Sequence, residues 1–164
     1  MDLNRKRNLW EIVIPSGILV GILDGAAAVI QTLAYGGDPV MVFQFIASGV
    51  FGNDAFSGGL PMAFYGLIFH LCIAMTWTTL FFLIYPKLEL FSKNRFITGL
   101  GYGLFIWLVM TRIVLPLSNV PQVPFRISSA IIEIVILMTV IGLPLSFIAN
   151  KFYSLQQKDN KLSS

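Results

Sequence analysis

Four apolar stretches, each long enough to cross a lipid bilayer as a helix, dominate this sequence. They cover about residues 11–35, 60–84, 96–117 and 127–150. A helix rises about 1.5 Å per residue, so about 20 residues cross a hydrocarbon core of about 30 Å. Because lipid cannot hydrogen-bond to backbone amides, each stretch should be helical. The sequence therefore predicts a single all-α integral membrane domain over residues 1–164, an up-down-up-down four-helix bundle.

Composition argues against a water-soluble domain. Hydrophobic residues make up 56% of the 164 residues and charged residues 12%, whereas a typical soluble domain has about 25% charged residues. A soluble chain of this length has too much surface for its volume to hide so much apolar area. We therefore expect the lipid bilayer to be its solvent.

No catalytic, cofactor or metal motif is evident. The sequence lacks a GxxxxGK[ST] phosphate loop, an HExxH zinc motif and a GxSxG elbow. His70 is the single histidine and Cys72 the single cysteine, which excludes an intrachain bis-histidine haem, a disulfide or a thiolate cluster. We expect no cofactor and no metal. Nucleic acid is not an expected partner, because the basic residues lie in short runs between apolar spans.

The lysines and arginines predict an orientation. Nine of the eleven lie on one side of the predicted bundle: Arg5, Lys6, Arg7, Lys87, Lys93, Arg95, Lys151, Lys158 and Lys161. The positive-inside rule makes this side cytoplasmic, so we expect both termini there and a multi-pass protein of the plasma (inner) membrane. The N-terminus also resembles a cleaved signal peptide. However, apolar character resumes at residues 29–33, which favours a retained span.

The segments outside the spans differ in character. The segment Pro39–Phe51 is apolar but too short to cross, which predicts an interfacial or re-entrant helix in the first outer loop. Pro15, Pro61, Pro86 and Pro116 are expected to mark span ends, whereas Pro144 should kink the fourth span. Residues 154–164 are polar, and we expect a cytoplasmic tail that frays.

Each span contains one strongly ionisable residue in its interior. They are Asp24, His70, Arg112 and Glu133. Their depths below the outer boundary come out at about 11, 15, 6 and 9 Å respectively. Since charge in hydrocarbon is costly, these side chains should face the bundle and pair. We expect Arg112 to form a salt bridge with Glu133, and Asp24 to pair with His70.

From these four residues we predict a functional site. They would line a polar chamber in the outer half of the bundle, which binds a small ion or polar molecule or relays protons. The alternative is that the pairs only fix the register of the helices. Gln31, Gln44 and Ser48 would line the mouth of the chamber or satisfy backbone groups. Asp38, Asn53 and Asp54 lack the regular spacing of a calcium loop.

Small residues predict close helix packing. Gly17, Gly21 and Gly25 form a ridge on the first span, and Gly99 and Gly103 form another at the start of the third. A homo-oligomer packed on the first ridge would suit a permeation path between subunits.

Several segments resemble small four-helix bacterial inner-membrane proteins of unknown function. These are FQFIASGVFGNDAFSGG (residues 43–59), GLIFH (66–70), YGLFIWLVM (102–110), VLPLSNVP (114–121) and GLPLS (142–146). A more distant similarity is to YagU-like membrane proteins. The resemblance implies a bacterial inner membrane and no assigned activity or catalytic residues. It also implies that Arg112 and Glu133 are a local variation.

Three functions follow as hypotheses. The first is transport or permeation of a small ion, proton or polar solute. The second is a non-catalytic accessory or assembly subunit with unlike membrane partners. The third is a membrane enzyme acting on lipid or quinone, with His70 and Asp24 as a general base pair. An enzyme is the least favoured, because no motif supports it.

Overall fold

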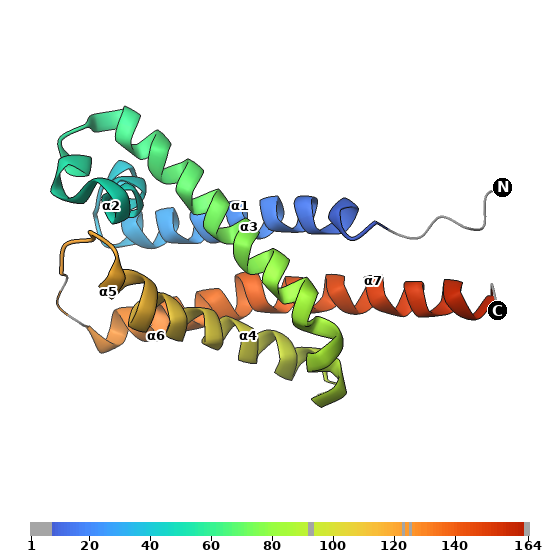
Figure 1. The fold of residues 1–164 in the computed structure, drawn as a ribbon. Coiled ribbons are helices and arrows are strands. Elements are labelled where there is room, and N and C mark those ends of the chain that lie inside the picture. Colours follow the sequence, from blue (N-terminus) through green and yellow to red (C-terminus); the bar gives the residue numbers. More distant parts are fainter. Residues whose placement is uncertain (1–7, 92–93, 123, 125, 163–164) are drawn as a thin grey trace.

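The computed structural model describes residues 8–91, 94–122, 124 and 126–162, which are almost entirely helical and contain no strand. Four helices in these residues are long and apolar enough to cross a membrane. They alternate in direction, and the first residues of the first span lie at the same end of the bundle as the last described residues of the fourth (Figure 1). The predicted all-α fold with four spans is therefore confirmed. We call the end where the first span begins and the fourth ends the terminal end, and the opposite end the α2 end.

The first two spans are continuous helices. The first is α1 (Trp10–Ala34) and the second is α3 (Gly59–Phe91). They pack closely through the predicted glycine ridge, because Gly17, Gly21 and Gly25 are all buried. A Cβ atom added to Gly17 would lie 2.8 Å from Met75 Sδ, so α3 already occupies this ridge. In this structure the ridge is thus covered by α3 of the same chain, and the homo-oligomer packed on it stays a prediction.

The last two spans are interrupted. The third consists of α4 (Arg95–Val109), the π-helical segment η2 (Met110–Val114) and α5 (Leu115–Leu117). The fourth consists of α6 (Ile127–Ile136), the π-helical segment η3 (Leu137–Gly142) and α7 (Leu143–Leu162). These spans meet where Gly99 and Gly103 lie against η3. A Cβ atom on Gly99 would come within 2.7 Å of the Gly142 carbonyl oxygen.

The same sequence follows both π-helical segments. Leu-Pro-Leu-Ser occupies residues 115–118 directly after η2 and residues 143–146 directly after η3. Proline lacks an amide hydrogen, and its ring clashes with the carbonyl four residues earlier, so the turn before it cannot remain a regular α-helix. Pro116 and Pro144 therefore account for the two widened turns. Where a kink was predicted at Pro144, the structure has the π-helical segment η3, which ends two residues before this proline.

A short helix closes the α2 end. The helix α2 (Pro39–Phe51) has the bounds predicted for the interfacial segment, and the 3₁₀ turn η1 (Gly52–Phe56) follows it. The helix α2 lies across the ends of the spans (Figure 1). Gln44 Nε2 donates to the Gly59 carbonyl at 3.1 Å, and Asn119 Nδ2 donates to the Val50 carbonyl at 3.1 Å. These bonds tie α2 to α3 on one side and to the connection after α5 on the other.

The terminal end holds the main core. Its largest fully buried side chains are Phe81, Phe82 and Tyr85 of α3, which pack with Tyr102 of α4 and Leu145 of α7. Aromatic rings contact one another here, as do the tilted rings of Phe81 and Tyr102, whose centroids lie 4.5 Å apart. Dense aromatic packing thus holds the two pairs of spans together at this end.

Two predicted boundaries at the terminal end were wrong. Pro86 does not end the second span, because α3 continues to Phe91. The tail from residue 154 was expected to fray, but α7 continues to Leu162. This tail segment contains neither glycine nor proline and is rich in good helix formers, so the helix has no local reason to stop. Residues 163–164 lie outside the described residues.

Candidate functional site

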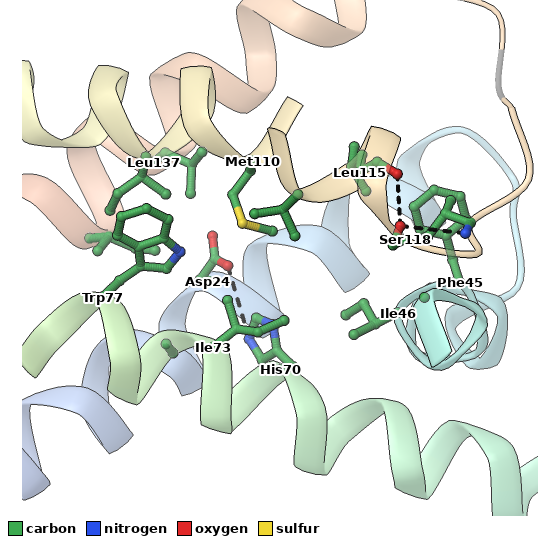
Figure 2. A pocket seen from close by; sticks show the side chains of 16 residues that line it. Asp24, Phe45, Ile46, His70, Ile73, Trp77, Met110, Leu115, Ser118 and Leu137 are labelled. Carbon is green, nitrogen blue, oxygen red and sulfur yellow. Dashed lines mark hydrogen bonds and ion pairs between the residues drawn. The ribbon is translucent and has the colours of Figure 1, made fainter. Parts of the chain in front are cut away.

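A cavity of about 230 Å³ lies between the two pairs of spans. One wall comes from Asp24 of α1 and from His70 and Trp77 of α3, and α2 contributes Phe45 and Ile46. The opposite wall comes from the interrupted spans, including Met110 of η2 and Leu137 of η3 (Figure 2). Both π-helical segments thus border the cavity. Such segments often occur at functional sites in proteins.

The structure brings Asp24 and His70 together in this cavity. His70 Nε2 lies 2.8 Å from the carbonyl oxygen of Gly21 and 4.0 Å from Asp24 Oδ2. A carbonyl oxygen only accepts hydrogen bonds, so Nε2 carries a proton. Asp24 follows Gly21 by three residues, so both lie on the face of α1 that is turned toward α3. The imidazole is therefore fixed by a backbone bond, with the carboxylate as its neighbour.

Gly25 makes room for the imidazole. A Cβ atom on Gly25 would lie 3.2 Å from His70 Nε2, closer than ordinary contact. Phe43 of α2 supports the ring from another side, edge-on, at 6.3 Å between centroids. The third glycine of the ridge thus positions His70 as well as packing two helices.

Two polar groups at the cavity retain unused hydrogen-bonding capacity. Within the described residues, neither His70 Nδ1 nor the Asp24 carboxylate has a hydrogen-bond partner. The Asp24 side chain is 21% exposed and that of His70 11%, so neither is sealed in the core. Figure 2 shows Asp24 between His70 and Met110. A carboxylate accepts hydrogen bonds, so the site suits a ligand that donates one to Asp24.

The remaining lining residues are mostly apolar. Leucine, isoleucine, valine, phenylalanine and methionine side chains make up most of the wall, and Ser118 is one of the few other polar residues. The Ser118 hydroxyl already donates to the Leu115 carbonyl at 2.8 Å. An apolar wall with a few placed polar groups is the usual character of a small-molecule pocket. The predicted polar chamber is therefore largely apolar, with its polarity concentrated at Asp24 and His70.

The structure does not bring Arg112 or Glu133 to this cavity. Neither is among its lining residues, and in the described part of the chain no ion pair joins them. Glu133 Oε2 instead accepts a hydrogen bond from Trp107 Nε1 at 3.3 Å. Arg112 lies in η2, where the wider turns shift side chains around the helix axis relative to a regular α-helix. The expected salt bridge is thus absent, and the four-residue chamber reduces to Asp24 and His70.

The other polar candidates serve the backbone. Gln44 bonds to the start of α3, as described above, and Ser48 Oγ donates to the Phe45 carbonyl at 2.6 Å. Asp38 Oδ1 accepts from the Val40 amide at 2.9 Å and so caps α2. Among the described residues no group of histidine, cysteine or acidic side chains is arranged to hold a metal ion.

The geometry does not favour a base pair for catalysis. The distance of 4.0 Å between His70 Nε2 and Asp24 Oδ2 exceeds a hydrogen bond, and Nε2 is already engaged by Gly21. A carboxylate that activates a histidine normally accepts directly from the ring. The pair is better arranged to bind a donor than to abstract a proton.

Sequence reasoning missed the residues that complete the cavity. Trp77, Met110 and Leu137 are ordinary apolar residues, and nothing in their type distinguishes them from core residues. The duplicated Leu-Pro-Leu-Ser was an available signal, because each copy marks an interrupted helix beside the cavity. Two interruptions in neighbouring spans would have placed a site between them.

Comparison with known proteins adds no relatives. No family model, no curated protein and no solved structure matches this chain, so the resemblance of its segments to small bacterial inner-membrane proteins stays a prediction.

Proposed function

We propose that this multi-pass membrane protein binds a small organic cation in the cavity between its two pairs of spans and moves it across the membrane. The ligand would have an apolar body and a hydrogen-bond-donating head, as an organic ammonium or guanidinium has. The observation that carries this proposal is that the Asp24 carboxylate and His70 Nδ1 have no hydrogen-bond partner among the described residues, in an otherwise apolar cavity of about 230 Å³.

The charge of the site favours a cation. Asp24 has no hydrogen-bond donor of its own within the described residues, and His70 Nε2, 4.0 Å from its carboxylate, is bonded to the Gly21 carbonyl instead. A donor head that carries positive charge would therefore supply what the carboxylate lacks. The apolar wall would accept the body of the ligand but would give a hydrated ion nothing to replace its water shell. This narrows the predicted substrate from any small ion to an organic one.

The interrupted helices support movement rather than static binding. In a π-helical turn the backbone hydrogen bonds are not those of a regular helix, and such turns often occur at functional sites. Many transporters place their binding sites at broken helices within the membrane. Here η2 and η3 lie in neighbouring spans that together form one wall of the cavity. A change of either turn would alter the cavity without unfolding a span.

The location is also a proposal. Nine of the eleven basic residues precede the first span, connect the second and third, or follow the fourth. This distribution supports an orientation with the terminal end in the cytoplasm and the α2 end outside. The bacterial inner membrane is what the resemblance of the segments implies. Tagging either terminus and measuring its protease accessibility in intact cells tests the orientation.

The test of transport uses uptake of radiolabelled benzylguanidinium into proteoliposomes. Like an arginine side chain, this probe stays protonated at neutral pH and so does not leak as a neutral base. We expect saturable uptake above that of protein-free liposomes. Asp24→Asn should lower the affinity by about tenfold or more, the usual effect of losing a charged hydrogen-bond partner. Arg126→Gln, a charge change in the loop, is the matched control and should leave uptake unchanged.

Two results would overturn the proposal. One is uptake equal to that of empty liposomes. The other is wild-type affinity in Asp24→Asn and His70→Ala together. Benzyltrimethylammonium has the same charge and ring but no N–H group, and it should compete poorly. Equal competition by this analogue would show that the acceptors do not select the ligand.

A second candidate is a subunit of a larger membrane complex. Arg112 and Glu133 are both exposed on spans that would otherwise contact lipid. Charge at such depth favours a protein neighbour. Purification in mild detergent tests this candidate, because it predicts unlike subunits in a constant ratio.

A further inference from the structure

Two ionisable side chains lie on the outer surface of the interrupted spans. Arg112 of η2 and Glu133 of α6 are exposed, although both belong to helices apolar enough to cross a membrane. Arg112 has no hydrogen bond or ion pair within the described residues, and the recorded bond of Glu133 is that from Trp107. Hydrocarbon offers such charges no partner. We therefore expect a partner for these two side chains outside the chain.

The two charges lie at nearly the same depth. Arg112 lies five residues before Leu117, where the third span ends, and Glu133 lies six residues after Ile127, where the fourth begins. At about 1.5 Å per residue both are roughly 7 to 9 Å below the α2 end of their spans. The chain thus presents one positive and one negative group at one level on one pair of helices.

We propose that two copies of this chain associate around a two-fold axis along the membrane normal, with Arg112 of each copy paired to Glu133 of the other. Such an axis keeps every residue at its own depth, so groups at one level meet. A two-fold interface is also self-complementary, so the two pairs form together. A guanidinium and a carboxylate give a strong, charge-assisted contact when water is absent.

The surface around Arg112 fits a neighbouring helix. Gly101, Leu104 and Leu108 recur every three or four residues on α4 and are all exposed, so they form one face of that helix. Arg112 is exposed in η2, which continues α4, and we call these four residues together the Arg112 face. A Cβ atom added to Gly101 would meet no atom within 4 Å. Nothing inside the chain therefore requires a glycine here. Small residues on an outward face let a second helix approach closely in a membrane.

A second copy is the partner that these observations favour. A second copy supplies a carboxylate for Arg112 and a guanidinium for Glu133, each at the matching depth. The glycine ridge of α1 is covered by α3 in this structure. The dimer does not depend on the proposed transport, since the Arg112 face lies outside the cavity.

The test is energy transfer between donor-labelled and acceptor-labelled chains in liposomes, measured against the protein-to-lipid ratio. We expect a dimer for the wild type and a dissociation constant raised by about tenfold or more for Arg112→Glu and for Glu133→Arg. A mixture of the two variants should regain transfer, because each then carries the charges that complement the other. Arg126→Glu is the matched charge-reversal control and should dimerise normally.

The mixture separates pairing between chains from pairing within one chain. If the two charges met inside one chain, each variant would carry two like charges and mixing would restore nothing. Failure of the mixture, or a wild type that stays monomeric at every lipid ratio, overturns the proposal. Gly101→Leu adds an independent check, since it should weaken the dimer while the unfolding of the chain stays unchanged. Wild-type dimerisation of Gly101→Leu would remove the Arg112 face from the interface.

Discussion

At the scale of single residues, one tyrosine completes a helix that a proline leaves incomplete. Pro86 lies inside α3 and has no amide hydrogen for the carbonyl four residues earlier, which belongs to Phe82. The Tyr153 hydroxyl of α7 donates to that carbonyl at 2.6 Å. A bare carbonyl would be costly in a dry environment, so the tyrosine explains why α3 continues past its proline. This bond also ties the second span to the fourth.

Tyr153→Phe should therefore destabilise the protein. We expect the free energy of unfolding to fall by about 1 kcal/mol, the usual net value of one such hydrogen bond. In a Pro86→Ala background the loss should be smaller, because the amide introduced at position 86 then bonds to Phe82. The unfolding of the wild type, the two single variants and the double variant in mixed micelles gives the coupling energy between Tyr153 and Pro86. Tyr35→Phe, at an exposed position, is the control, and equal losses in both backgrounds would contradict the explanation.

At the scale of elements, each interrupted span has a proline shortly after a π-helical segment, whereas Pro15 and Pro86 lie inside continuous α-helices. Pro116 and Pro144 each follow a π-helical segment that borders the cavity, whereas Pro15 lies in α1 without any π-helical turn. The position of Pro15 in the second turn of its helix leaves few earlier carbonyls to disturb. The shape of the cavity therefore depends on where a proline lies within its span.

Pro144→Ala should restore a regular helix through η3. We expect the free energy of unfolding to rise, by at most about 3 kcal/mol, because an interior proline costs that much. Benzylguanidinium uptake should fall, because Leu137 would turn away from its place in the cavity wall. Pro15→Ala is the matched control, since it removes a proline distant from the cavity. A stabilised Pro144→Ala protein with wild-type uptake would show that η3 plays no part in transport.

The elements also show what the sequence can predict. Apolar length alone located the spans, because hydrocarbon thickness dictates it, and α2 has the predicted bounds. The predicted end of α3 was wrong because another span compensates for its proline, where Tyr153 donates to the Phe82 carbonyl. The predicted fraying of the tail was wrong because its polar character does not prevent a helix. Arg112 and Glu133 were expected to meet because unpaired charge is costly in hydrocarbon. Arg112 instead lies exposed in η2 and Glu133 accepts from Trp107, and both outcomes depend on how the spans pack.

At the scale of the whole molecule, the two ends of the bundle are built differently. Aromatic side chains fill the terminal end, while the α2 end has the cavity, closed by one short helix across the spans (Figure 1). Among the described residues, polar bonds from Asn119 join α2 to the connection after α5, from its amide to the Gly49 carbonyl and from its side chain to the Val50 carbonyl. Local opening should therefore begin at the α2 end.

Asn119→Ala tests whether the α2 end opens independently of the terminal end. It removes the side-chain bond to Val50 but keeps the backbone bond to Gly49, so we expect a modest cost of about 1 kcal/mol that is confined to α2. Hydrogen exchange followed by mass spectrometry should show faster exchange in α2 and η1, with unchanged protection around Phe81 and Tyr85. Asn53→Ala, in the exposed turn after α2, serves as the control. Faster exchange at both ends of the bundle would mean that the protein opens as one unit, and that α2 is not an independent cover of the cavity.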